Sequence, residues 1–167
     1  MAAAGSDTAC ERLRNEATAR GIDPARLVFA EPVPRAEHLS RHRLADVFLD
    51  TLPFGATAAS DALWAGVPVV TCKGNAFAAR IGASLVTAAG HYDLIAADLA
   101  GYEAHALQLA AEPEWLAARK RRLDEERAGA PLFDIDRFRR HVEAAYAQMY
   151  ALLRSSTPPQ SFAVTAE

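Results

Sequence analysis

The chain alternates short, fully apolar runs with segments whose apolar residues recur at helical spacing. The apolar runs lie at residues 27–30, 46–50 and 67–71, and a shorter one is expected around Leu94. Runs of this length without polar alternation are typical of strands that are buried on both faces of a parallel sheet. Strands that alternate with helices predict an α/β domain with a three-layer, Rossmann-like parallel sheet.

Helices are predicted between and after these strands. Capping residues or a proline open the first of them, and Gly21 and Gly66 are expected to end two of them. The expected helices cover residues 6–20, 34–45 and 57–64, a segment that carries Phe77, Ile81 and Leu85, and most of the chain from Leu99 to Arg154.

The C-terminal part of the chain combines a helical stripe with an aperiodic tail. Phe138, Val142, Ala145 and Met149 recur at helical spacing, and we expect them to pack in the core. Residues 155–167 contain turn and breaker residues without periodicity, which predicts a disordered tail. The sequence therefore predicts one domain over residues 1–154, a helical C-terminus and a short tail.

The composition argues against several classes of protein, among them nucleic-acid-binding, disulfide-rich and membrane-spanning proteins. The 167 residues carry 18 Lys and Arg against 21 Asp and Glu, a net charge of -3 that does not support a nucleic-acid footprint. Cys10 and Cys72 are isolated, and none of His91, His105 and His141 has a partner at metal-ligand spacing, so neither a disulfide framework nor a metal site is expected. The N-terminus does not read as a secretory signal, and no apolar stretch approaches the roughly 20 residues of a membrane span. We expect a soluble, cytoplasmic protein.

The turn after the apolar run 46–50 is a candidate anion site. Ligands of parallel α/β sheets bind beyond the carboxyl ends of the strands, and this turn lies at such an end. Gly55 permits a close backbone approach, and the helix opened by Thr57 offers unpaired N–H groups, with Ser60 and Asp61 nearby. The local features alone favour the simpler alternative, in which Thr57 is only an N-cap and Asp61 only compensates the helix dipole.

A cationic cluster follows the run 27–30. His38 could stack on a flat base, while Arg35 and Arg41 could meet phosphate or ribose. The alternative is a solvated amphipathic helix with surface charges. The residues themselves leave both readings open.

One long segment resembles a known family. The motif "D-x-LWAG-x-P-V-V-T", at residues 61–71, is highly specific, and the similarity extends over about residues 8 to 152. The chain resembles the C-terminal catalytic lobe of the SPINDLY-type O-linked N-acetylglucosamine transferases of glycosyltransferase family 41. That resemblance implies the two-lobed GT-B architecture, and a lobe that binds UDP-N-acetylglucosamine without a metal or other cofactor.

The resemblance also assigns roles to individual residues. It implies that His38 stacks on uracil, that Arg35 lies near the base and ribose, and that Asp61 contacts the ribose. The turn at residues 55–57 matches the pyrophosphate-binding turn, but it reads "GATAAS" where the family commonly has "GHTT" or "AHTT", so a histidine is absent and Ala58 replaces a threonine. The complete expected donor site is Arg35, His38, Arg41, Gly55, Ala56, Thr57, Ala58, Ser60 and Asp61.

Taken together, these features predict the nucleotide-sugar-binding lobe of a metal-independent, inverting protein O-glycosyltransferase that acts on Ser/Thr hydroxyls. The family lobe opens with two strands that are missing here, and its catalytic base is expected in a missing acceptor lobe that follows tetratricopeptide repeats. We therefore expect an inactive fragment that reaches its protein acceptor only through those parts. The strand at residues 27–30 would pair with the strand at residues 46–50 or leave an edge for self-association. The alternative is a non-catalytic nucleotide-binding or protein-interaction module of the same fold.

Overall fold

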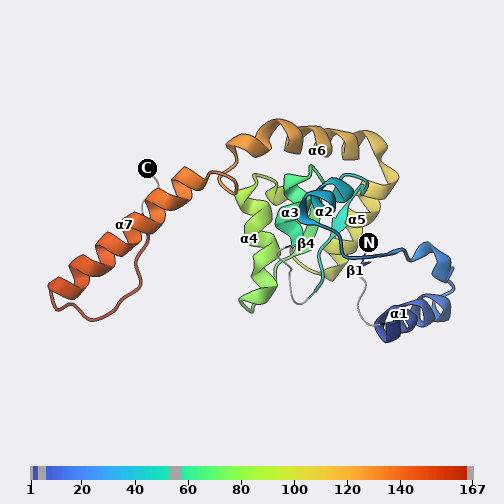
Figure 1. The fold of residues 1–167 in the computed structure, drawn as a ribbon, viewed down its shortest axis with the longest axis horizontal. Helices are drawn as coiled ribbons and strands as arrows, with labels where there is room; N and C mark the ends of the chain where they lie inside the picture. Colours follow the sequence, from blue (N-terminus) through green and yellow to red (C-terminus); the bar gives the residue numbers. More distant parts are fainter. Residues whose placement is uncertain (1, 4–6, 53–57, 165–167) are drawn as a thin grey trace. The chain divides into compact units, whose positions relative to one another are not determined.

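A computed structural model describes residues 2–3, 7–52 and 58–164 of the chain (Figure 1). The chain forms two compact units, residues 1–41 and 42–167. None of the helices in the described ranges is long and apolar enough to cross a membrane.

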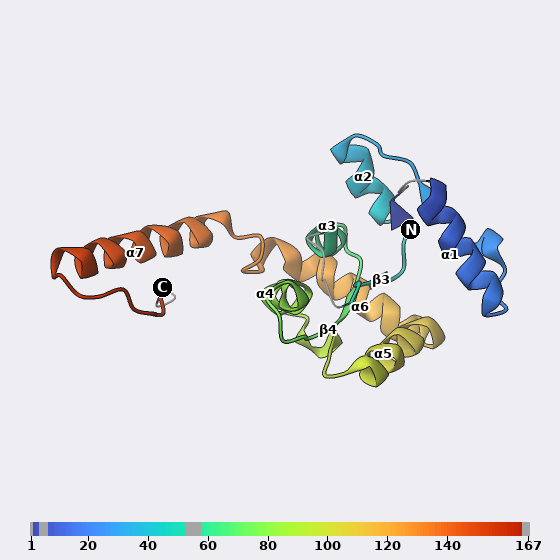
Figure 2. The same cartoon turned by 90° about the horizontal axis from the view of Figure 1, so that it is seen from below.

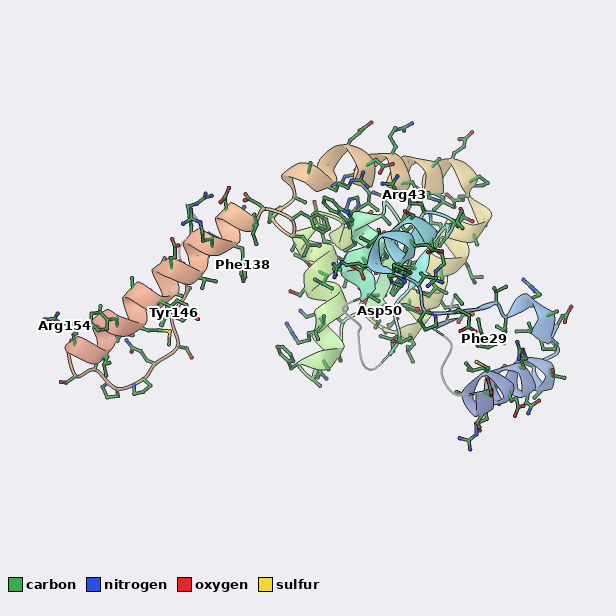
Figure 3. The ribbon with its side chains drawn as sticks, in the orientation of Figure 1. Phe29, Arg43, Asp50, Phe138, Tyr146 and Arg154 are labelled. Atoms are coloured by element: carbon green, nitrogen blue, oxygen red, sulfur yellow. The ribbon has the colours of Figure 1, made fainter. Side chains whose placement is uncertain are left out.

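The first unit is a small β-α-β arrangement followed by a helix. It contains β1 (Ala2–Ala3), α1 (Asp7–Ala19), β2 (Phe29–Ala30) and α2 (Arg35–His42), whose last residue begins the second unit. α1 ends as predicted at Gly21, which has a φ of +72°. The Arg14 guanidinium lies 4.9 Å from the centre of the Phe29 ring, so α1 contacts the strand that follows it (Figure 3).

The pairing of β2 corrects one expectation. Ala2–Ala3 pairs with Phe29–Ala30 in parallel, whereas the strand at residues 46–50 belongs to another sheet. The apolar run at residues 27–30 therefore has a strand neighbour within the chain. Two alanines ahead of a helix carry no strand signal of their own, because alanine is not enriched in strands.

The second unit is built on a parallel sheet with strand order β3-β4-β5. Leu49 lies opposite Val70, and Thr71 lies opposite Ile95. The strands are β3 (Phe48–Leu49), β4 (Val69–Cys72) and β5 (Ile95–Ala96), and the helices are α3 (Ala58–Trp64), α4 (Ile81–Ala88), α5 (Leu99–Ala111), α6 (Pro113–Glu126) and α7 (Ile135–Arg154).

Helices cover the sheet of the second unit and bury its central strand. α3 and α4 pack on each other and on β4, while α5, backed by α6, packs on β4 and β5 (Figure 2). All four residues of β4 are buried, as expected for a fully apolar run in a covered sheet. Leu63, Val86, Leu109 and Leu123 bring α3, α4, α5 and α6 into the same core. The predicted α/β class, its Rossmann-like parallel strands and its helical C-terminus are confirmed.

Gly66 ends α3 as predicted. Its φ is +82°, and the amides of Gly66 and Val67 donate to the carbonyls of Leu63 and Ala62. A Cβ atom at Gly66 would lie 2.8 Å from Oδ1 of the exposed Asp124 side chain, which can move aside, so glycine is favoured here by the positive φ of the turn.

The predicted helical position of Phe77 and the predicted core packing of the stripe on α7 are both wrong. Phe77 precedes the short 3-10 turn before α4 and is 86% exposed. No residue of α7 is buried, and the exposed fraction of Phe138 is 63%. Helical spacing correctly identified α7 as amphipathic, but periodicity does not show which surface covers an apolar stripe. Residues 155–164 form no helix or strand. The single domain over residues 1–154 and the disorder of the tail remain predictions.

Candidate functional site

A buried hydrogen bond joins the carboxyl ends of β3 and β4. Asp50, which follows β3 directly, is 3% exposed, and Thr71 in β4 is 1% exposed. The Thr71 hydroxyl donates to Asp50 Oδ2 at 2.8 Å. A carboxylate can be buried this deeply because polar partners are built around it.

Gly82 in α4 makes room for that pair. A Cβ atom built on Gly82 would lie 2.0 Å from Asp50 Oδ2 and 2.7 Å from Thr71 Oγ1. The absence of a side chain at this position lets the backbone of α4 close directly over the two polar groups.

A tyrosine from α5 fixes the backbone at the same place. The Tyr102 hydroxyl donates to the carbonyl oxygen of Asp50 at 2.9 Å. Burial, and next the charge of Asp50, raise the pKa of Tyr102 above its ordinary value. The phenol therefore stays protonated and remains a donor. β4, α4 and α5 together fix the point at which the chain leaves β3.

The predicted diphosphate turn comes next in the chain. Gly55, Ala56 and Thr57 lie outside the described residues. Ala58 begins α3, and Ser60 and Asp61 lie half-buried in its first turn. An acidic side chain in the first turn of a helix is favoured by the helix dipole. The position of Asp61 therefore fits both a contact to the ribose and simple compensation of the dipole.

α2 carries the other part of the predicted site. The Arg41 side chain contacts two groups: its Nη2 lies 3.1 Å from His38 Nδ1, and its Nη1 donates to the Glu31 carbonyl at 2.8 Å. A guanidinium can only donate, so Nδ1 of His38 accepts and Nε2 carries the ring proton. The structure thus brings His38 and Arg41 together just after β2, while Arg35 lies exposed at the first position of α2.

Two further observations concern metal binding and the residues around Asp50. In the described ranges, no group of three His, Cys, Asp or Glu side chains is placed to hold a metal ion. The cluster of Asp50, Thr71, Gly82 and Tyr102 was missed. A carboxylate that ends an apolar run was a usable signal for Asp50, whereas nothing in the local sequence marks Tyr102 as its partner.

Comparison with known proteins gives consistent matches. The chain is 38% identical over 155 residues to the probable UDP-N-acetylglucosamine--peptide N-acetylglucosaminyltransferase SEC of Arabidopsis thaliana, covering 92% of this chain and 16% of that protein. It is 34% identical over 149 residues to the UDP-N-acetylglucosamine--peptide N-acetylglucosaminyltransferase of Caenorhabditis elegans, covering 89% of this chain and 13% of that protein. The chain therefore spans about a sixth or less of the length of these relatives.

A solved structure agrees with these sequence matches. A mutant of the Thermobaculum terrenum O-GlcNAc transferase superposes with a TM-score of 0.81 at 33% identity, covering 87% of this chain and 28% of that one. Residues 6–142 match the family described as Glycosyl transferase family 41, which is most of the chain. The chain belongs to glycosyl transferase family 41.

Proposed function

We propose that this chain is the nucleotide-sugar-binding lobe of a protein O-glycosyltransferase that acts on Ser/Thr hydroxyls, with a donor of the UDP-N-acetylglucosamine type. Membership of family 41 supports the reaction class, and so do the names of the relatives in Arabidopsis thaliana and Caenorhabditis elegans. Because the chain corresponds to only 16% and 13% of those proteins, the proposal assigns it one binding function within a larger enzyme.

The observation that carries the proposal is the arrangement of His38 and Arg41. Arg41 is tied to the Glu31 carbonyl and holds Nδ1 of the imidazole, so the ring has a fixed orientation and a defined tautomer. A fixed, half-buried flat ring beyond a parallel strand suits stacking on a base. We assign His38 to the uracil, Arg41 to the positioning of His38, and Arg35 to the base and ribose.

The diphosphate and ribose are assigned to α3 and the turn before it. Asp61 accepts hydrogen bonds from ribose hydroxyls, and Ala58 and Ser60 lie next to it in the first helical turn. Gly55, Ala56 and Thr57 are assigned to the pyrophosphate from the family resemblance alone. Ala58 has no hydroxyl, so backbone N–H groups contribute more of the binding here than in relatives that have a threonine.

The proposed reaction is a direct displacement with inversion. The acceptor hydroxyl oxygen forms a bond to the anomeric carbon while the bond from that carbon to the β-phosphate oxygen breaks, and UDP leaves with the electron pair. The hydroxyl proton passes to a base, a role that we assign to no residue of this chain. Cations and backbone donors stabilise the charge on UDP without a metal. The isolated chain is expected to bind the donor without transferring the sugar. It would meet its protein acceptor through an acceptor lobe and tetratricopeptide repeats, in the cytoplasm.

Calorimetric titration of the full chain with UDP tests this proposal. The substitutions His38→Ala and Asp61→Ala are each expected to weaken UDP binding by about tenfold. His42→Ala on the same helix and Glu103→Ala on α5 are matched controls and should leave the affinity unchanged. A chain that is folded by circular dichroism yet binds no UDP would rule out a working donor site.

A further inference from the structure

A cleft lies along α4. Its volume is about 860 Å³, and it lies entirely within the second unit. It is lined by Lys73, Phe77, Arg80, Ile81, Ala83, Ser84, Leu85, Thr87, Ala88, Tyr92 and Ile95. None of the donor-site residues that the structure describes belongs to this lining: these are Arg35, His38, Arg41, Ala58, Ser60 and Asp61.

The floor of the cleft is apolar, and its two ends are aromatic. Ile81, Leu85 and Ala88 follow one face of α4 and are half-buried. Phe77 at one end is 86% exposed, and Tyr92 at the other end is 68% exposed. Two large rings exposed at the ends of one apolar floor offer a partner more contact area than isolated surface residues do.

The charge of the cleft has a single sign. Lys73 and Arg80 line it and are exposed, and no carboxylate is among the lining residues that the structure describes. Within the described part of the chain, neither cation has an ion-pair partner. Asp93, the acidic neighbour of Tyr92, is paired with Arg119 at 2.6 Å. The cleft therefore suits a ligand that supplies negative charge at one end.

The length of the cleft favours an extended segment over a compact ligand. Phe77 and Ala88 are separated by the 3-10 turn and the whole of α4, which corresponds to about 18 Å of helix. An extended chain of about five residues spans that distance. The hydroxyl oxygens of Ser84 and Thr87 lie along the cleft, and they can accept hydrogen bonds from the N–H groups of such a segment.

We propose that this cleft is a docking site for a short, extended peptide segment in which carboxylates stand next to apolar side chains. The carboxylates pair with Lys73 and Arg80, and the apolar side chains cover Ile81, Leu85 and Ile95. None of the described residues that we assign to the donor lines this cleft, so peptide binding does not require UDP.

Fluorescence anisotropy of the full chain tests the specificity of this site. The probe is a labelled, N-acetylated peptide Glu-Glu-Leu-Phe-Leu, compared with Lys-Lys-Leu-Phe-Leu and Glu-Glu-Ser-Ser-Ser. We expect both reference peptides to bind at least about tenfold more weakly than the probe. The double substitution Lys73→Met with Arg80→Met should weaken binding of the probe to a similar extent. Arg121→Met, which removes an exposed cation from α6, is the matched control and should not.

Two further measurements locate the peptide. Lys73 and Lys120 are the two lysines of the chain, so acetylation followed by mass spectrometry reports on both in one sample. The probe should protect Lys73 and leave Lys120 unchanged, because Lys120 pairs with Asp46 outside the cleft. Ser84→Trp should block binding without removing a charge.

Three results would overturn the proposal. The first is equal affinity for the acidic and basic peptides, and the second is absence of binding to a chain that is folded by circular dichroism. The third is displacement of the probe by UDP, since the cleft would then belong to the nucleotide site.

Discussion

The hydroxyl of Thr71 and the carboxylate of Asp50 form a 2.8 Å hydrogen bond between two neighbouring parallel strands, and both side chains are buried. This contact fixes the carboxyl edge of the sheet directly before the turn that we assign to the donor. Because Asp50 also accepts from Tyr102 through its carbonyl, one residue links β3 to β4 and α5. The first predictions test how much of the fold depends on this contact.

Thr71→Val should destabilise the protein by about 1.5–3 kcal/mol, because it keeps the shape but removes a hydrogen bond to a buried carboxylate. Urea unfolding measures the change. Thr87→Val is the control, since its hydroxyl donates within α4 to the Ala83 carbonyl on an exposed surface, and it should stay within about 0.5 kcal/mol of the wild type. Equal effects of the two substitutions would contradict a special role for the buried pair.

Gly82→Ala should cost about 1–3 kcal/mol, since the added methyl group would lie 2.0 Å from Asp50 Oδ2 and would push α4 away from β4. Gly129→Ala is the matched control, because a Cβ atom at Gly129 meets no atom within 4 Å. Thermal unfolding of both variants separates the close approach from a general effect of replacing glycine. A Gly82→Ala variant as stable as the Gly129→Ala variant would argue against tight packing at this position.

His91 should make stability depend on pH. Its ring is 1% exposed, and neither ring nitrogen has a hydrogen-bond partner in the described part of the chain. Burial, and next the charge of Arg122, lower the pKa of His91 below 6.5, so the unfolded chain binds its proton more readily than the folded chain. Stability should therefore be fully present above about pH 6.5 and decrease as the pH falls towards the lowered pKa of the folded state.

Urea unfolding at a series of pH values measures this dependence. His91→Leu should flatten the decrease below pH 6.5, because a leucine carries no proton. His105→Leu on α5 is the comparison, and it should keep the wild-type decrease. An unchanged pH profile in the His91→Leu variant would show that another group is responsible.

Arg41→Ala should weaken UDP binding about fivefold to tenfold, because the imidazole of His38 loses the donor that fixes its orientation. This prediction depends on the proposed function, but its spectroscopic part does not. Nitrogen NMR should show the Nε2–H tautomer of His38 in the wild type and a mixture of tautomers in the variant. Arg43→Ala, at an exposed residue next to α2, is the control and should change neither result (Figure 3).

Phe138→Ser should leave the free energy of unfolding within about 0.5 kcal/mol of the wild type, because this ring is exposed on α7. Leu109→Ala in the core should cost about 2–5 kcal/mol in the same assay. Phe138, Tyr146 and Arg154 mark the length of α7 in Figure 3. A large effect of Phe138→Ser would mean that the apolar stripe of α7 is covered in solution.

The sequence located the strands better than it defined their pairing. The apolar runs at residues 27–30, 46–50 and 67–71 each contain most of a real strand, although β2 and β3 are only two residues long. An apolar run reports burial, while pairing depends on residues far away in the sequence. Ala2–Ala3 therefore remained unrecognised as the neighbour of β2.

The candidate site was predictable to the extent that it resembles a known motif. His38 and Asp61 were found through local chemistry combined with the family pattern, and their roles remain predictions. The cluster around Asp50 could not be found in this way. Its members come from a strand end, a second strand and two helices, and only folding brings residues 50, 71, 82 and 102 together.

The closure of α4 over Asp50 and Thr71 has a consequence for how this lobe could change over time. The residues that fix the sheet edge are separate from those that we assign to the ligand, so the turn could accept substitutions without loss of the fold. A change such as alanine for threonine at position 58 would then alter donor preference at little cost in stability. New donor specificities could be selected at this turn while the scaffold beneath it stays constant.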